Sequence, residues 1–349
     1  MVTAKRAALV LSVMTLLVFG AVFARWTILG REIPRDKILL PQLVVLAYDS
    51  FTAPLGPAAA LIKAFEAECH CQVQVIASGD SGMLLEKMRL TKPSVKIDVV
   101  IGVDQLSLGA ARSVQEWRPL NFSKSNWDAQ IKPWLEPDFI PFDWAPLTFI
   151  YRQNEIEPPV KVADLTEPRF AGMIALQDPR TSSPGLQFLF ALQNWFGHGQ
   201  MNAFMKKFKT NIHSVSPSWS TAYGLFQRQQ AKMAFSYLTS LVYHWTVEKN
   251  PSYQAVSFSE GHPVQVEYVG VPADCKHCEL AESFVAHLLK TDSQKLIMEK
   301  NFMLPVVKDV RQGTVYEELP KLRLFEPTPR EKFEAARPGL IESWQKSLQ

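Results

Sequence analysis

The chain has 349 residues, of which 47% are hydrophobic and 20% are charged, and its formal net charge is +3. A chain of this length and hydrophobicity can bury a large core, and because single cores stop growing at roughly 250–300 residues, we expect two lobes. Lysine and arginine are scattered along the chain rather than grouped in a basic stripe. This pattern argues against a nucleic-acid partner.

The N-terminus has the features of an export segment. Lys5 and Arg6 precede an uncharged, mostly apolar run over residues 7–24. A basic start followed by such a run predicts a signal peptide over residues 1–24. At 18 residues the run is also just long enough to span a bilayer, so an uncleaved membrane anchor is the alternative. In both cases we expect the rest of the chain in the periplasm, with residues 25–41 as a spacer.

The four cysteines occur as two close pairs, Cys69 with Cys71 and Cys275 with Cys278. An oxidising compartment favours disulfides for an exported chain. Two local bridges, cross-bridges between the pairs, and free thiols all remain open. The neighbouring histidines make zinc binding a further alternative, although we expect no metal.

Hydrophobic periodicity predicts strands alternating with helices along the chain. The predicted strands cover residues 43–46, 72–76, 97–103, 173–177, 233–237 and 264–271. The predicted helices cover residues 57–68, 83–90, 184–196, 201–210, 218–228, 240–249, 279–289 and 293–300. The β-α-β-α-β order at the start indicates an α/β protein with a parallel sheet and helices on its faces.

Residues 139–151 form a long apolar stretch with two prolines, too interrupted for a helix and too long for one ordinary strand. We interpret this stretch as a crossover between lobes. The alternating, β-branched strand at 264–271 is expected to return the chain to the first lobe. Residues 42–143 and 255–349 are then predicted to form a discontinuous first lobe, and residues 144–254 the second.

Four loops follow predicted strands, and in open α/β sheets ligands bind beyond the carboxyl ends of the strands. These loops cover residues 48–51, 79–82, 178–185 and 237–240. In the third loop, Ser182 and Ser183 stand just before Pro184, an arrangement typical of a helix N-cap. They are expected either to cap the helix only or also to contact a phosphate or hydroxyl group of a ligand.

Aromatic residues gather near the same loops. The set comprises Tyr48, Trp144, Trp219, Tyr223, Tyr237 and Tyr243. Asp49 and Asp80 stand in two of the loops. Aromatic faces attract cations and carboxylates supply the opposite charge, so this combination favours a flat cationic ligand.

Several ordered segments resemble the thiamine-binding periplasmic proteins of ABC importers. They are YDSF at 48–51, AFEAECHC at 64–71, IDVVIGVD at 97–104, FIPFDWAPLTFIY at 139–151, QDPRTSSPGL at 177–186, SWSTAYGLF at 218–226, SYLTSLVYH at 236–244 and FSEGHPVQVE at 258–267. The similarity extends from about residue 43 to about residue 306. The resemblance implies the two-lobed periplasmic-binding type II fold, with mixed or parallel sheets, which closes on its ligand by a hinge.

The resemblance also implies function. A protein of this family captures thiamine or a thiamine phosphate as a monomer and passes it to an ABC permease in the inner membrane, without catalysis and without a cofactor. Carried over by position, Tyr48, Trp219, Tyr237 and Tyr243 are expected to form an aromatic box around the thiamine rings. Asp49 and Asp80 are expected to be the nearby acids, and Ser182 and Ser183 to meet the hydroxyethyl or phosphate end.

The sequence differs from the family at three places. The family has tryptophan where this chain has Leu55 and again where it has Phe302, and the Cys275–Cys278 pair is not expected of the family. Phe302 retains a ring, whereas Leu55 does not. The ligand therefore stays open among thiamine, its monophosphate and a pyrimidine or thiazole fragment.

Three other functions are weighed. The first is a thiamine-degrading enzyme of the same fold, which would need a cysteine nucleophile, yet no cysteine lies in the four loops. The second is a ferric-ion binder, although the adjacent tyrosines of that branch are missing. The third is a binder of a polyamine or another organic cation.

His262 is expected to have a structural or hinge role, while Asp143 and Trp144 are assigned either to hinge packing or to the pocket wall.

Overall fold

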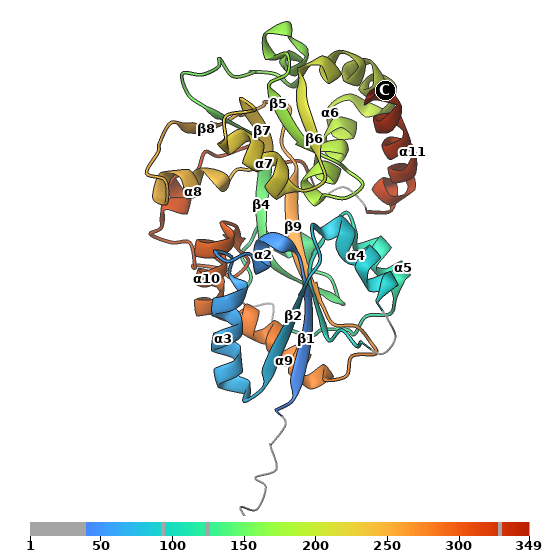
Figure 1. The fold of residues 1–349 in the computed structure, drawn as a ribbon, viewed down its shortest axis with the longest axis vertical. Helices are drawn as coiled ribbons and strands as arrows, with labels where there is room; N and C mark the ends of the chain where they lie inside the picture. The colour runs from blue at the N-terminus through green and yellow to red at the C-terminus, as the bar shows by residue number, and fades with distance from the viewer. Residues whose placement is uncertain (1–39, 92–94, 123–125, 327–329, 349) are drawn as a thin grey trace, which may run out of the picture. The chain divides into compact units, whose positions relative to one another are not determined.

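A computed structural model of the chain describes residues 40–91, 95–122, 126–326 and 330–348 (Figure 1). The predicted export segment and nearly all of the predicted spacer lie outside the described residues. Among the helices within these ranges, none combines the length and the apolar character needed to cross a membrane.

The described residues alternate between strands and helices, as predicted for an α/β protein. The strands are β1 (Gln42–Ala47), β2 (Gln72–Ala77), β3 (Val99–Asp104), β4 (Phe139–Arg152), β5 (Ile174–Gln177), β6 (Ile212–Ser216), β7 (Met233–Tyr237), β8 (Tyr253–Ala255), β9 (Val264–Gly270) and β10 (Leu304–Pro305). The helices are α2 (Asp49–Thr52), α3 (Ala58–Cys69), α4 (Ser81–Leu90), α5 (Leu108–Val114), α6 (Ser183–Phe208), α7 (Trp219–Gln227), α8 (Ser240–Thr246), α9 (Cys278–Leu288), α10 (Thr291–Asn301) and α11 (Arg330–Leu348). The sequence predicted two helices, over residues 184–196 and 201–210, in the region of α6. The helical backbone of α6 is interrupted between them at Gly197, whose φ is 64°.

The strands form one mixed sheet in the order β2-β1-β3-β9-β4-β7-β5-β6, with β8 and β10 paired to β4. In the first lobe β1 pairs in parallel with β2 and β3, which confirms the predicted parallel start. Strand β9 then lies antiparallel between β3 and β4. In the second lobe β5 lies parallel to both β6 and β7. The carboxyl ends of the parallel strands in each lobe carry the loops that were expected to hold a ligand.

Strand β4 connects the lobes. Its first half pairs with β9 and β10 and its second half with β7 and β8, and Figure 1 shows it passing from one lobe to the other. The predicted crossover is therefore confirmed, but the stretch is a single strand of 14 residues, longer than we expected. The strand tolerates Pro141 because its ladder with β9 shifts register between Pro141 and Asp143, and prolines fit at such irregularities.

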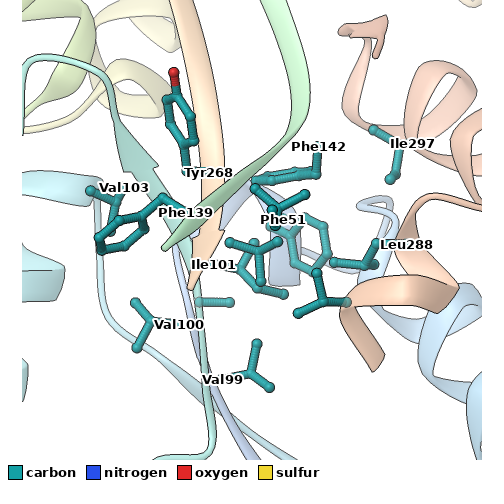
Figure 2. Packing of buried hydrophobic residues seen from close by; sticks show 14 of the residues in the cluster. Phe51, Val99, Val100, Ile101, Val103, Phe139, Phe142, Tyr268, Leu288 and Ile297 are labelled. Carbon is teal, nitrogen blue, oxygen red and sulfur yellow. The ribbon is translucent and has the colours of Figure 1, made fainter. Parts of the chain in front are cut away.

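Each lobe has its own aromatic core. In the first lobe Phe51 meets Phe142 edge to face at 5.9 Å, close to the apolar side chains of β3 (Figure 2). In the second lobe Phe149 and Phe188 form a similar edge contact, also at 5.9 Å. These packed cores hold the strand ends of each lobe in fixed positions.

The C-terminal helix departs from the predicted division into lobes. Residues 255–349 were assigned to the first lobe, but Phe333, Leu340 and Trp344 of α11 are buried in the core of the second. Trp344 lies 6.1 Å from Phe188 of α6 in an edge contact. The reason is the apolar face of α11, which is covered by α6.

The cysteines form two local disulfides, Cys69–Cys71 and Cys275–Cys278. This arrangement is one of the alternatives that the sequence left open. Within the described ranges, no group of three or more histidine, cysteine or acidic side chains could hold a metal ion.

Asp98 anchors the second disulfide loop to the sheet. Its buried carboxylate accepts hydrogen bonds from the backbone N–H groups of Val44 at 2.9 Å, Lys276 at 2.7 Å and His277 at 2.9 Å. Replacing Asp98 by alanine leaves three donors without a partner and should lower the free energy of unfolding by at least about 2 kcal/mol. Chemical denaturation measures this change.

The matched control is Asp292→Ala, because the Asp292 side chain is 96% exposed and its ion pair with Lys295 is long, at 3.9 Å. This control should change the free energy of unfolding by less than about 0.5 kcal/mol. Equal effects of the two substitutions would contradict the anchoring role of Asp98.

Candidate functional site

A cavity of about 490 Å³ lies between the loops at the strand ends of the two lobes. Its volume is within the range of roughly 300–1,000 Å³ that is usual for small-molecule sites. The chemically distinctive lining residues are Tyr48, Asp49, Asp80, Trp219, Tyr223, Tyr237, Tyr243, Glu267, Lys300, Asn301 and Phe302. The lining thus includes six aromatic rings, three carboxyl groups and one lysine.

Tyr48 follows β1 directly, and its ring lies against β3. Gly102 makes this position possible, because a Cβ atom on that residue would lie 2.1 Å from Cδ1 of the tyrosine. Gly102 also has a φ of 104°, a conformation that other residues rarely adopt, at a register shift between β3 and β9. A glycine within the buried strand thus creates the space for a cavity-lining aromatic ring.

Trp219 is the centre of an aromatic cluster in the second lobe. Its ring stacks on Tyr223 with 5.0 Å between centroids and is tilted against Tyr237 at 5.9 Å. The indole Nε1 donates to the hydroxyl of Ser236 at 2.8 Å, which fixes the rotation of the ring. The half-buried indole is therefore held in place before any ligand arrives.

A hydrogen-bonded chain that begins at the buried Tyr223 supports the ring under Trp219. The hydroxyl of Tyr223 lies 2.7 Å from Nε2 of His244, and Nδ1 of the same imidazole lies 2.7 Å from Oε2 of Glu248. Because a carboxylate only accepts, Nδ1 carries the proton and the tyrosine hydroxyl donates to Nε2. Burial lowers the pKa of His244, so its ring is neutral.

The two positions that differ from the family both line the cavity. Phe302 packs edge to face against Tyr243 at 5.3 Å, so a ring is kept at this wall. Leu55 is 78% exposed, and its aliphatic side chain offers no ring to a ligand. The loss of aromatic surface is therefore confined to the Leu55 side of the cavity.

Two buried acids face each other beneath the aromatic rings. Asp143 of β4 and Glu267 of β9 are directly opposite in the antiparallel ladder, so their side chains lie on the same face of the sheet. Burial, and then the charge of Glu267, raises the pKa of Asp143 well above its ordinary value. Burial is also the main cause that raises the pKa of Glu267 to about 7. Two like charges in this position are unfavourable, so the pair retains a proton near neutral pH.

Amide side chains hold these acids and the tyrosine hydroxyls together. Asn301 donates from Nδ2 to the hydroxyl of Tyr48 and to Oδ2 of Asp143, both at 2.7 Å. Gln265 donates from Nε2 to the hydroxyl of Tyr237 and to Oε1 of Glu267, both at 2.8 Å. Burial, followed by the charge of Glu267, raises the pKa of both tyrosines well above its ordinary value. The phenols are therefore neutral hydrogen-bonding groups.

Six of the eight predicted site residues line the cavity: Tyr48, Asp49, Asp80, Trp219, Tyr237 and Tyr243. Asp49 accepts a hydrogen bond from the backbone N–H of Gly79 at 2.8 Å, which ties the first two loops together. Their contact with a ligand remains a prediction.

Ser182 and Ser183 are buried and do not belong to the cavity lining. Ser182 is the N-cap residue of α6, but its side chain does not cap the helix as expected. Its hydroxyl donates to Oδ2 of Asp80 at 2.7 Å, and the hydroxyl of Ser183 donates to Asp104. Each carboxylate of the first lobe accepts a charge-assisted hydrogen bond from one of these hydroxyls, and this bond turns the hydroxyl toward the first lobe.

Two other sequence candidates have structural positions. Trp144 is buried in the first core and donates from Nε1 to the carbonyl of Pro305 at 3.2 Å. His262 accepts from the N–H of Phe258 at 2.8 Å and donates to the carbonyl of Leu147 at 3.2 Å. Burial lowers the pKa of His262 to about 4. These contacts are consistent with the structural role predicted for this histidine.

Sequence patterns did not reveal Glu267, Asn301 or Lys300 as lining residues. In β9 the polar residues Gln265 and Glu267 alternate with apolar ones, a pattern typical of a strand with one solvated face. Both are in fact buried. One feature of the sequence could have identified Glu267 as a lining residue. It is a glutamate in the strand that was predicted to return the chain to the first lobe.

The fold and this cavity define a class of protein. The sequence matches the bacterial extracellular solute-binding protein family over residues 60–323, and the chain belongs to this family.

Individual relatives make the comparison more specific. The chain is 37% identical over 314 residues to the thiamine-binding periplasmic protein of Escherichia coli (strain K12), covering 88% of this chain and 94% of the relative. It is 31% identical over 311 residues to the thiamine-binding periplasmic protein of Haemophilus influenzae, covering 87% and 91%. A solved periplasmic thiamin binding protein superposes with a TM-score of 0.81 at 33% identity, covering 91% of this chain and 99% of that one. The ferric binding protein from Campylobacter jejuni, at 15% identity and a TM-score of 0.72, shares the fold.

The raised pKa of Glu267 has a consequence for stability. A carboxyl whose pKa is higher in the folded than in the unfolded state stabilises the fold below the unfolded pKa, and this contribution is lost as the pH rises through the folded pKa. From pH 4.5 to pH 8 the wild-type free energy of unfolding should therefore fall by about 1–3 kcal/mol relative to Glu267→Gln. Denaturant titrations of both proteins across this range measure the difference. A difference that is constant with pH would contradict the buried, partly protonated state of Glu267.

Proposed function

We propose that the protein captures thiamine or a thiamine phosphate in the periplasm, encloses it between its lobes, and delivers it to the permease of an ABC importer. The observation that carries this proposal is one cavity that combines a fixed aromatic cluster around Trp219 with the buried carboxyl of Glu267. The names of the relatives support the same ligand.

The chemistry of thiamine fits this cavity. Thiamine carries a permanent positive charge on one flat ring and has a second flat ring with hydrogen-bonding groups. Aromatic faces such as those of Trp219 and Tyr237 attract a desolvated cation by roughly 2 kcal/mol or more. Glu267 supplies a negative charge once it ionises, and the tyrosine hydroxyls and Asn301 offer hydrogen bonds to the polar edges.

The proposed action is binding without catalysis. The enzyme alternative requires a cysteine nucleophile, but all four cysteines are paired in disulfides and none lines the cavity. We therefore expect thiamine to be recovered unchanged after incubation with the protein. Chromatography of the released ligand tests this expectation, and recovery of a cleaved pyrimidine would contradict it.

The aromatic cluster gives a direct test of the ligand. Trp219→Ala should weaken thiamine binding by about 1–2 kcal/mol or more, because a ring face opposite the cation is lost. Isothermal titration calorimetry with thiamine, thiamine monophosphate and spermidine measures the affinity and separates a thiamine site from a general organic-cation site. Trp134, which is also partly exposed but does not line the cavity, provides the control Trp134→Ala.

Unchanged affinity in Trp219→Ala would remove this residue from the site. Tighter binding of spermidine than of thiamine by the wild-type protein would replace thiamine by a polyamine as the ligand.

Binding of a cation should depend on pH through Glu267. The cation favours the ionised carboxylate, and burial raises the pKa of this group to about 7, so binding must expel a proton at lower pH. We expect the dissociation constant for thiamine to fall by about threefold to tenfold between pH 6 and pH 8. In Glu267→Gln this pH dependence should disappear. Calorimetric titrations at several pH values test the prediction, and an equal slope in both proteins would contradict the role of Glu267.

A further inference from the structure

Asp80 connects the two lobes at the edge of the cavity. It follows β2 in the first lobe, just before α4. Its Oδ2 accepts two hydrogen bonds from the second lobe, one from the hydroxyl of Ser182 at 2.7 Å and one from the backbone N–H of Trp219 at 3.1 Å. A single carboxylate oxygen thus joins three segments that lie far apart in the sequence.

Both partners stand at the start of a helix. Ser182 is the N-cap residue of α6, and Trp219 is the first residue of α7. The first N–H groups of a helix have no partner within the helix, and this end carries a partial positive charge. The carboxylate of Asp80 satisfies one such group directly and lies beside the positive ends of both helices. An acid of the first lobe therefore compensates two helix ends of the second.

The backbones of the two lobes also meet next to this contact. A Cβ atom on Gly82 would lie 2.7 Å from the carbonyl oxygen of Thr181. Only a glycine allows α4 to approach the loop before α6 so closely. The close approach is independent of the hydrogen bonds and shows that the lobes are closed around Asp80.

The contact reaches the aromatic cluster through Trp219. Asp80 holds the backbone of this residue, and Ser236 holds its indole nitrogen. The ring is therefore placed by one anchor from each lobe. Opening of the lobes removes the first anchor, and closure restores it.

We propose that Asp80 is a positioning residue that clasps the closed lobes at the N-termini of α6 and α7 and so sets the Trp219 ring against the ligand. This clasp adds to the ligand contact expected of Asp80 and acts through Trp219 and lobe closure. It rests on the proposed function only for the identity of the ligand.

Amide hydrogen exchange tests the clasp without a ligand. As the first residue of α7, Trp219 owes the protection of its N–H to Asp80. In the ligand-free protein this amide should exchange at least about fivefold more slowly than in Asp80→Ala, and Asp80→Asn, which keeps an acceptor oxygen, should retain part of the protection. Equal exchange at Trp219 in the wild type and Asp80→Ala would overturn the proposal.

Ser182 gives a second test because it forms the clasp without lining the cavity. Ser182→Ala should raise the dissociation rate of thiamine, followed by stopped-flow tryptophan fluorescence, by about threefold to tenfold. Ser293→Ala is the control, since Ser293 is equally buried near the start of α10 within the first lobe. Faster dissociation in Asp80→Ala but not in Ser182→Ala would show that Asp80 is only a ligand contact and would overturn the clasp.

The two proposals can fail separately. If the wild-type protein does not bind thiamine in calorimetry, the proposed function fails, while the exchange of the Trp219 amide still decides whether Asp80 clasps the lobes.

Discussion

The antiparallel pairing of β4 with β9 is the constraint on which the rest of the structure depends. Both strands pass between the lobes, and their register places Asp143 opposite Glu267, with both side chains buried. Burial raises the pKa of both acids, so the pair retains a proton near neutral pH at the place where we propose that a cation binds. The strand pair therefore connects the lobes and provides the negative charge of the proposed site.

Much of the site could be predicted because parallel strands direct their carboxyl ends to one edge of a sheet. Tyr48 and Asp80 follow such strands and Tyr237 ends one, and the structure brings all three to one cavity. Sequence patterns distinguish less well between the aromatic residues that line the cavity and those that belong to the core. Trp144 belongs to the same sequence cluster, but its position in β4 faces the core.

The remaining features depend on tertiary contacts that sequence patterns do not show. Glu267 lies in a strand whose alternation is typical of a solvated face, yet in the folded protein both Gln265 and Glu267 are buried. Ser182 has the sequence context of a helix cap, yet its hydroxyl is taken by Asp80 from the other lobe. The position of α11 follows from its contact with α6, in which Trp344 meets Phe188, 156 residues earlier in the chain.

The proposed function and the proposed clasp together link ligand capture to closure of the lobes. The carboxylate of Asp80 compensates helix ends of the second lobe, while the Asp143 and Glu267 pair lies below the rings. In the proposed function, a cation enters between these negative groups and contacts the rings that both lobes hold in place. A crystal structure with thiamine bound tests this account most directly. It should show the charged ring against Trp219 and Tyr237 with Glu267 as its nearest carboxylate. An anion in the cavity, or thiamine bound away from these residues, would contradict it.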